Sequence, residues 1–187
     1  MTAADEFRLV AEGFSARVHG VAADGWDVPA PVEGWVARDV LRHLVEWFPG
    51  FLAGGSDVTL PAVPPVDDHP VAAWEVFASS VQAVLDDPAT GDRSFSNPHT
   101  GDLPLADAIS QFFTADVFMH TWDLARATGQ DDTLDADRCQ MMVEGMAPYD
   151  DLLRSSGQYG PRVPVADDAD PQSRLLGFIG RDPHWTP

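Results

Sequence analysis

The stretch DVFMHTWDLARATG, residues 116–129, is the most informative segment of the sequence. It is apolar nearly all round, apart from a few charged residues at helical spacing, and Gly129 is of the type that commonly ends a helix. Upstream, Pro104 stands where proline is tolerated in a first helical turn. The sequence therefore predicts one long helix from about Pro104 to Ala127.

Further helices are predicted from apolar residues that recur every three or four positions. The segments are 3–24, about 36–53, about 71–85, about 136–155 and about 171–179. Pro49 lies inside the second of these, so we expect that helix to kink or end near Phe48. Residues 54–70 hold too many helix breakers for regular structure and predict a crossover loop. Residues 93–103 predict a short hairpin or a lid.

These elements predict an all-α fold: a four-helix bundle with extra C-terminal helices. At 187 residues the chain is long enough for one domain, 1–187, and too short for two ordinary ones. The loops at 54–70 and 87–103 are long enough to join parallel neighbours, so an up-down-down-up order of helices is open to this chain.

The composition is strongly acidic, with 11 basic and 30 acidic residues and a formal charge of −19. Such a surface repels nucleic acid and anionic membranes, so we expect neither as a partner. No signal region and no apolar run of membrane-spanning length stands out, which predicts a cytoplasmic protein. The single cysteine, Cys139, has three methionines close by in the sequence and is interpreted as a structural core residue.

The long helix carries the first two residues of a candidate metal site. Asp116 and His120 are four residues apart and share a helix face, with Cβ atoms about 5–6 Å apart. His43, in the second helix, would lie at a similar depth if the two helices run antiparallel. Two histidines and one carboxylate leave a coordination position open, as in catalytic zinc sites.

Two more residues lie on the same face of the long helix by steps of three and four, Phe112 and Asp123. Asp123 could orient a metal ligand or bind a water molecule. The alternative is an ion pair between Asp123 and Arg126 on the following turn.

The second helix offers Trp47, four residues beyond His43, as a pocket residue. Asp39, four residues before His43, is interpreted as a charge that favours the start of the helix. His99, in the predicted hairpin or lid, is a candidate visitor to the site.

Other chemistries find little support in the sequence. It contains no G-x-S-x-G, G-x-x-x-x-G-K or C-x-x-C motif and no G-x-G-x-x-G after a strand, which disfavours nucleophilic hydrolysis, nucleotide use and thioredoxin-like redox work.

An Asp and a His four apart are common by chance, and a histidine in an amphipathic helix is more often a hydrogen-bonded core residue. A polar tie without metal therefore stays open.

Four segments, in order, carry a resemblance to a known family: WDVPAPVEGW at 26–35, RDVLRHLV at 38–45, the stretch at 116–129, and RLLGFIGRDP at 174–183. Together they resemble the actinobacterial proteins grouped with the mycothiol-dependent maleylpyruvate isomerase N-terminal domain, within the DinB-like superfamily. The resemblance implies a DinB-like up-down-down-up four-helix bundle. It also implies a divalent metal, zinc first and nickel second, held by His43, Asp116 and His120.

The chain departs from this family in several places. The isomerase has glutamate where this chain has Asp116, and it has a further C-terminal domain for which 187 residues leave no room. Relatives often have cysteine at the position of Val32 and a hydroxyl residue at that of Val36, where valine cannot cap the following helix. Isomerase activity itself therefore does not follow from the resemblance.

The preferred hypothesis is a mycothiol-dependent transferase or isomerase. Its metal would ionise a small-molecule thiol, with mycothiol as cosubstrate, and the thiolate would attack a small electrophile. Asp123 or His99 would relay a proton. Metal-assisted hydrolysis and a non-catalytic interaction module are the alternatives, and a homodimer stays open.

Overall fold

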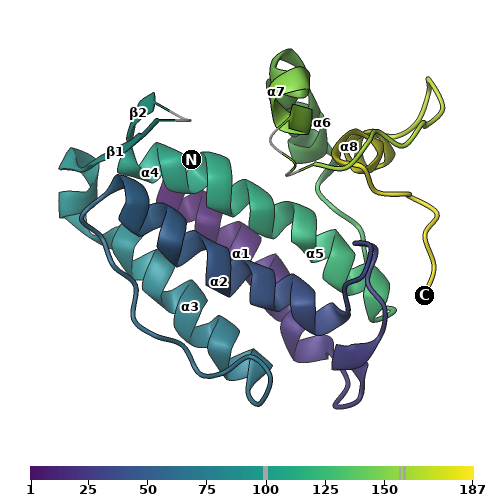
Figure 1. Ribbon diagram of the computed structural model, residues 1–187, viewed down its shortest axis with the longest axis horizontal. Helices are drawn as coiled ribbons and strands as arrows, with labels where there is room; N and C mark the ends of the chain where they lie inside the picture. The colour runs from purple at the N-terminus through teal and green to yellow at the C-terminus, as the bar shows by residue number, and fades with distance from the viewer. Residues whose placement is uncertain (99–100, 156, 158) are drawn as a thin grey trace.

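The computed structural model describes residues 1–98, 101–155, 157 and 159–187. Four long helices lie side by side: α1 (Ala3–Gly20), α2 (Ala37–Gly55), α3 (Pro70–Asp86) and α5 (Ala115–Ala127). α1 contacts α3 and α5, and α2 contacts the same two helices. In Figure 1, α1 and α5 run in one direction, and α2 and α3 run in the other. The chain is mostly helical, which confirms the predicted all-α class.

The apolar faces of these helices meet in one core. Its largest fully buried side chains include Phe7, Phe14, Phe48, Trp74, Phe77, Phe113 and Trp122. α1 begins at a capping box, in which the Thr2 hydroxyl accepts a hydrogen bond from the Asp5 N–H and the Asp5 carboxylate accepts one from the Thr2 N–H. It ends at Gly20, four residues before the predicted end, and the short turn η1 (Gly25–Asp27) follows.

α2 continues through Pro49 to Gly55, so of the two outcomes expected there, a kink or an end near Phe48, the end is wrong. Proline removes one backbone donor and crowds the carbonyl of the residue four positions earlier. Buried side chains on both sides of it, Phe48 and Leu52, nevertheless hold the last turns of α2 in the core. Burial of this apolar surface outweighs the local cost of the proline.

The predicted helix at 104–127 covers the right residues but has three parts. α4 (Leu105–Ala108) leads into a π-helical turn, η3 (Ile109–Thr114), and α5 follows without a break. Within η3 the Thr114 hydroxyl donates to the carbonyl of Ile109, five residues earlier. The wider π turn shifts residues before Thr114 around the helix axis relative to those after it.

The expected hairpin is present. β1 (Ser94–Asn97) pairs antiparallel with β2 (Gly101–Pro104), after the 3-10 turn η2 (Pro88–Asp92). Phe95 of β1 is buried and stacks on Phe51 of α2 with ring centroids 4.6 Å apart. A Cβ atom on Gly55 would lie 2.3 Å from the Phe95 ring, so only glycine fits there.

The remaining elements lie together on the α5 side of the bundle (Figure 1): α6 (Ala136–Met146), η4 (Ala147–Tyr149), α7 (Asp150–Ser155) and α8 (Pro171–Ile179). The predicted helix at 136–155 is interrupted by η4, where Pro148 cannot continue the α-helical hydrogen bonding. α8 matches its predicted range, and α6 packs against it. Among the described residues, no helix is long and apolar enough to cross a membrane.

Candidate metal centre

The antiparallel packing of α2 and α5 brings the three predicted ligands together. His43 comes from α2, and Asp116 and His120 come from successive turns of α5. The Nε2 atom of His43 lies 3.2 Å from Oδ2 of Asp116, and Nε2 of His120 lies 3.4 Å from Oδ1 of the same carboxylate. One ligand atom from each residue lies within 4.8 Å of the other two.

These separations fit a divalent metal. In a tetrahedral zinc site with bonds of about 2.0–2.1 Å, ligand atoms lie about 3.3–3.4 Å apart. The separations of 3.2 and 3.4 Å are close to that spacing, but they run to the two different oxygens of Asp116, and the shorter one is also a hydrogen-bond distance. Among the described residues, no other group of three His, Cys, Asp or Glu side chains meets the same 4.8 Å limit.

His120 lies between two carboxylates. Its Nδ1 atom is 2.8 Å from Oδ2 of Asp123, and its Nε2 atom faces Asp116. Burial alone would lower the pKa of His120, but Asp116 and then Asp123 raise it above the ordinary value. Without a metal, a proton on Nδ1 would face Asp123 and a proton on Nε2 would face Asp116. A metal on the Nε2 side would take the place of one of these protons.

Asp123 lies on the buried side of the cluster, and its side chain is only 1 % exposed. Arg181 makes a bidentate contact with this carboxylate: Nε donates to Oδ1 at 2.9 Å, and Nη2 donates to Oδ2 at 3.1 Å. Burial would raise the pKa of Asp123, but Arg181 and then His120 lower it, so the carboxylate stays ionised. Asp123 therefore holds the ring of His120, and its role behind a metal ligand stays a prediction.

The alternative ion pair between Asp123 and Arg126 is wrong. Arg126 instead pairs with Asp132 at 2.8 Å and donates to the carbonyls of Pro183 and Trp185. One helical turn separates Asp123 from Arg126, but the two side chains leave α5 toward different neighbours.

Two tryptophans border the cluster. The indole Nε1 of Trp47 donates to Oδ2 of Asp116 at 2.9 Å, which fixes the carboxylate from the α2 side. The ring of Trp35 lies 5.2 Å from that of His43 and 5.9 Å from that of His120, measured between centroids. Trp47 is therefore placed beside the site as predicted, and Trp35 joins it from the segment before α2.

The sequence predicts Phe112 on the same face as Asp116, but Phe112 lies inside the π turn η3, where α-helical spacing does not hold. In the structure Phe112 packs against Phe51 with centroids 5.2 Å apart. Phe113 lies 6.2 Å from the ring of Trp47 and is the phenylalanine that borders this side of the cluster. A straight α-helical projection cannot show this exchange, because it assumes 3.6 residues in every turn.

The cluster opens toward solvent on the α2 side. The side chains of His43, Asp116 and His120 are 33 %, 18 % and 7 % exposed. Tyr159 is partly buried, and its pKa is raised to about 12, first by burial and then by the charge of Asp116. Its phenol is therefore protonated at neutral pH.

Other residues singled out in the sequence have structural roles. Asp39 accepts a hydrogen bond from the Val36 N–H at 3.0 Å, so this carboxylate helps to begin a helix whose cap position lacks a hydroxyl. Cys139 is buried, and burial raises the pKa of its thiol to about 12. His99 lies outside the described residues.

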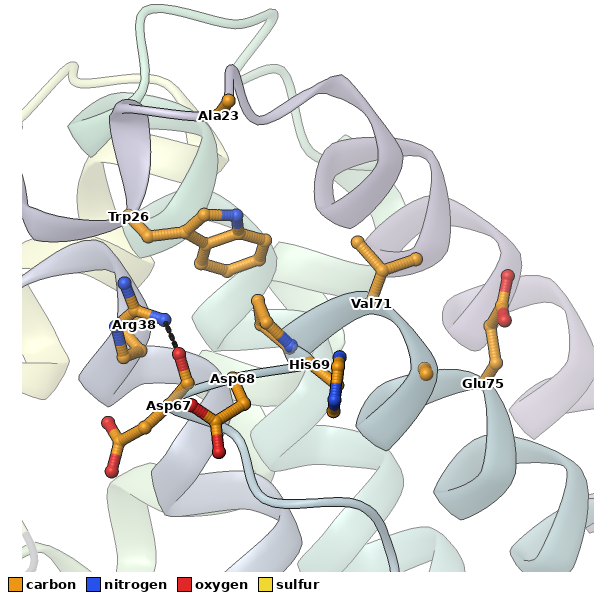
Figure 2. A pocket seen from close by; sticks show the side chains of 10 residues that line it. Ala23, Trp26, Arg38, Asp67, Asp68, His69, Val71 and Glu75 are labelled. Atoms are coloured by element: carbon orange, nitrogen blue, oxygen red, sulfur yellow. Dashed lines mark hydrogen bonds between the residues drawn. The ribbon is translucent and has the colours of Figure 1, made fainter.

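A separate cavity of about 500 Å³ lies at the start of α3 (Figure 2). Trp26, Arg38, Asp67 and His69 are among its lining residues, and Arg38 donates to the backbone carbonyl of Asp67 at 2.8 Å. None of the three candidate ligands lines this cavity. This cavity is therefore not part of the candidate metal centre.

Two relatives are similar to the chain over nearly its whole length. They are two proteins of Mycobacterium tuberculosis strains that carry the names uncharacterized protein MT0763 and uncharacterized protein Rv0738. Each is 31 % identical over 181 residues, which cover 91 % of this chain and 92 % of the relative. No model of a known protein family matches the chain. No solved structure matches it.

Proposed function

The chain belongs to the family of those two mycobacterial proteins, and we propose for it a function that rests on its own site. It is a metal-dependent enzyme of the mycothiol-dependent transferase or isomerase class. His43, Asp116 and His120 hold a divalent metal, zinc first and nickel second. The substrates are a low-molecular-weight thiol, such as mycothiol, and a small electrophile.

The observation that carries the proposal is the convergence of His43 and His120 on opposite oxygens of Asp116. The directions of the four long helices also agree with the up-down-down-up order of a DinB-like bundle, the fold that the resemblance implies. Asp116 replaces a glutamate of the isomerase, and its shorter side chain still reaches both imidazoles.

The charges around the site favour an anionic fourth ligand. Asp116 and Asp123 carry two negative charges, and Arg181 carries one positive charge. With neutral histidines and a divalent cation, the cluster has a net charge of +1, which one thiolate balances. A metal of this kind supplies acidity, since a coordinated thiol is deprotonated at neutral pH.

The protein's own groups would position the reactants. Trp47 holds the Asp116 carboxylate by its N–H, and Asp123 holds the ring of His120. The exposed side of His43 leaves a path for a small thiol. The phenol of Tyr159, protonated at neutral pH, is a candidate donor to an electrophile that gains negative charge.

The same charge balance would also accept hydroxide, so metal-assisted hydrolysis stays the second candidate. The two differ in one measurable property: a hydrolase needs no affinity for a thiol. A polar tie without metal, as in an interaction module, predicts a chain that is purified free of metal in the absence of chelator.

The test is elemental analysis combined with thiol titration on wild type, His43→Ala and His19→Ala. His19 is an exposed histidine paired with Glu75 and serves as the matched control. We expect about one metal ion per chain and saturable thiol binding in wild type and His19→Ala, and loss of both in His43→Ala. Equal metal content in all three proteins contradicts the three-residue site, and bound metal without thiol affinity contradicts the thiol chemistry.

A further inference from the structure

We infer that Arg181, in the segment that follows α8, is a positioning residue of the metal centre: it fixes the Asp123 carboxylate, which in turn fixes the ring of His120. The inference rests on the proposed metal site. It extends the centre beyond the helices that carry the ligands, to a part of the chain 58 residues from Asp123.

The hydrogen bonds leave the Asp123 carboxylate little freedom. Arg181 occupies Oδ1 through Nε, and Oδ2 is shared by Nη2 of Arg181 and Nδ1 of His120. A two-pronged guanidinium–carboxylate contact sets the plane of the carboxylate as well as its position. The direction of Oδ2, and so the rotation of the His120 ring, follows from where Arg181 lies.

Arg181 is itself held on a rigid element. α8 ends at Ile179, the next residue, Gly180, takes the left-handed conformation with φ of 84°, and the Arg181 N–H donates to the carbonyl of Leu176 at 2.8 Å. A Cβ atom on Gly180 would lie 2.9 Å from the carbonyl oxygen of Pro161, so the backbone of the preceding loop closes on this glycine. The guanidinium therefore extends from a fixed helix end.

Stability alone is a poor reason for this arrangement. The side chains of Arg181 and Asp123 are 16 % and 1 % exposed. Transferring these two charged groups out of water costs free energy that offsets much of their mutual attraction. The C-terminal segment also has another attachment to α5, through the contacts of Arg126 with the carbonyls of Pro183 and Trp185. Of these two arginines, Arg181 is the one that contacts Asp123, the carboxylate beside the candidate ligand His120.

Arg126 thus provides a matched control, because it anchors the same segment without touching Asp123. The experiment uses the full chain with Co²⁺ as the probe, in wild type, Arg181→Gln, Arg181→Lys and Arg126→Gln. Two quantities are measured: the affinity for Co²⁺ and the visible absorption spectrum at saturation, which reports the ligand geometry. Urea unfolding curves check that each variant is folded.

Groups that orient metal ligands typically contribute 10–100-fold in affinity, so we expect about that loss, with an altered spectrum, for Arg181→Gln. Arg181→Lys keeps the charge and one donor, and its loss should be smaller. Arg126→Gln should keep the wild-type affinity within about twofold and the wild-type spectrum. If Arg181→Gln does not fold, the comparison of Arg181→Lys with Arg126→Gln decides.

Wild-type affinity and spectrum in a folded Arg181→Gln would overturn the inference, as would the same result in Arg181→Lys where Arg181→Gln does not fold, or an equal loss in Arg126→Gln. A wild-type chain that binds no Co²⁺ would instead overturn the metal site itself, and this inference with it. The two failures are therefore distinguishable in the same set of titrations.

Discussion

The interface of α2 with the helical run from η3 to α5 has two ends of opposite character. At one end Phe48 stacks on Phe113 with ring centroids 4.1 Å apart, and Phe77 lies 5.6 Å from Phe113. At the other end His43 meets Asp116 and His120. Trp47 is the boundary, since its ring lies 6.2 Å from that of Phe113 while its N–H donates to Asp116.

The two ends contribute differently to the free energy of folding. The aromatic end buries apolar surface and gains from dense packing. The polar end removes charged groups from water, and the attraction among them at best offsets that cost. A bundle that needed only stability could carry apolar side chains at both ends, so the polar end points to a purpose other than folding.

The largest expected effect separates the two ends directly. Phe113 is fully buried, so Phe113→Ala should lower the free energy of unfolding by about 3–5 kcal/mol, through lost burial and a cavity. His43→Ala should cost about 1 kcal/mol or less in the metal-free protein, because its side chain is partly exposed. Denaturant unfolding of both variants measures the difference. Similar losses would mean that the polar end is a structural tie.

The boundary residue gives the next effect. Trp47→Phe keeps an aromatic ring for the phenylalanine cluster and removes the N–H that holds Asp116. Zinc affinity should fall about tenfold, since the carboxylate loses an orienting donor. Competition with a chelating dye measures the affinity. An unchanged affinity would show that the packing of α2 against α5, without this hydrogen bond, orients the carboxylate.

The stability of the metal-free fold and the affinity for zinc should depend on pH with opposite signs. Burial lowers the pKa of His120, but Asp116 and Asp123 together raise it above the ordinary 6.5. Protonated His120 therefore stabilises the metal-free fold fully below the unfolded-state pKa of about 6.5, and this contribution is lost as pH rises through the higher folded-state pKa.

Zinc needs the neutral ring, so its affinity should increase by up to about tenfold per pH unit below that folded-state pKa and then level off. Zinc titrations between about pH 6 and 8, with unfolding curves of the metal-free protein over the same range, check both signs. An affinity that is independent of pH would remove His120 from the set of ligands.

The smallest expected effect concerns Cys139. Its thiol is buried, and its pKa of about 12 makes it a poor nucleophile and a poor metal ligand at neutral pH. Cys139→Ala should leave the zinc content and the thiol affinity unchanged, and iodoacetamide should modify the wild-type thiol only after unfolding. Rapid alkylation of the native chain would show that this region opens.

Much of the fold follows from local patterns. The apolar spacing predicted α3 and α8 within one residue of their bounds, because the residues that these helices bury recur at every third or fourth position. The passage of α2 through Pro49 and the π turn of η3 were not predictable in the same way. Each depends on tertiary packing that outweighs a local rule.

The candidate site divides similarly. His43, Asp116 and His120 could be predicted from spacing, because a step of four on one helix and a shared depth on an antiparallel neighbour are geometric facts. Arg181 could not be predicted in this way, because helical spacing does not show which distant segment folds back over α5. The fourth family-like segment, 174–183, contains Arg181 and was the one available signal.

The most direct test of the metal centre is X-ray absorption at the zinc edge of the zinc-loaded chain, with and without a small thiol. We expect a shell of nitrogen and oxygen at about 2.0–2.1 Å with imidazole scattering, and one sulfur at about 2.3 Å when the thiol is added. The only cysteine of the chain, Cys139, is buried and is not among the clustered residues, so a sulfur that is present only after the thiol is added comes from that thiol. A zinc shell without imidazole, or no sulfur at saturating thiol, would contradict this expectation.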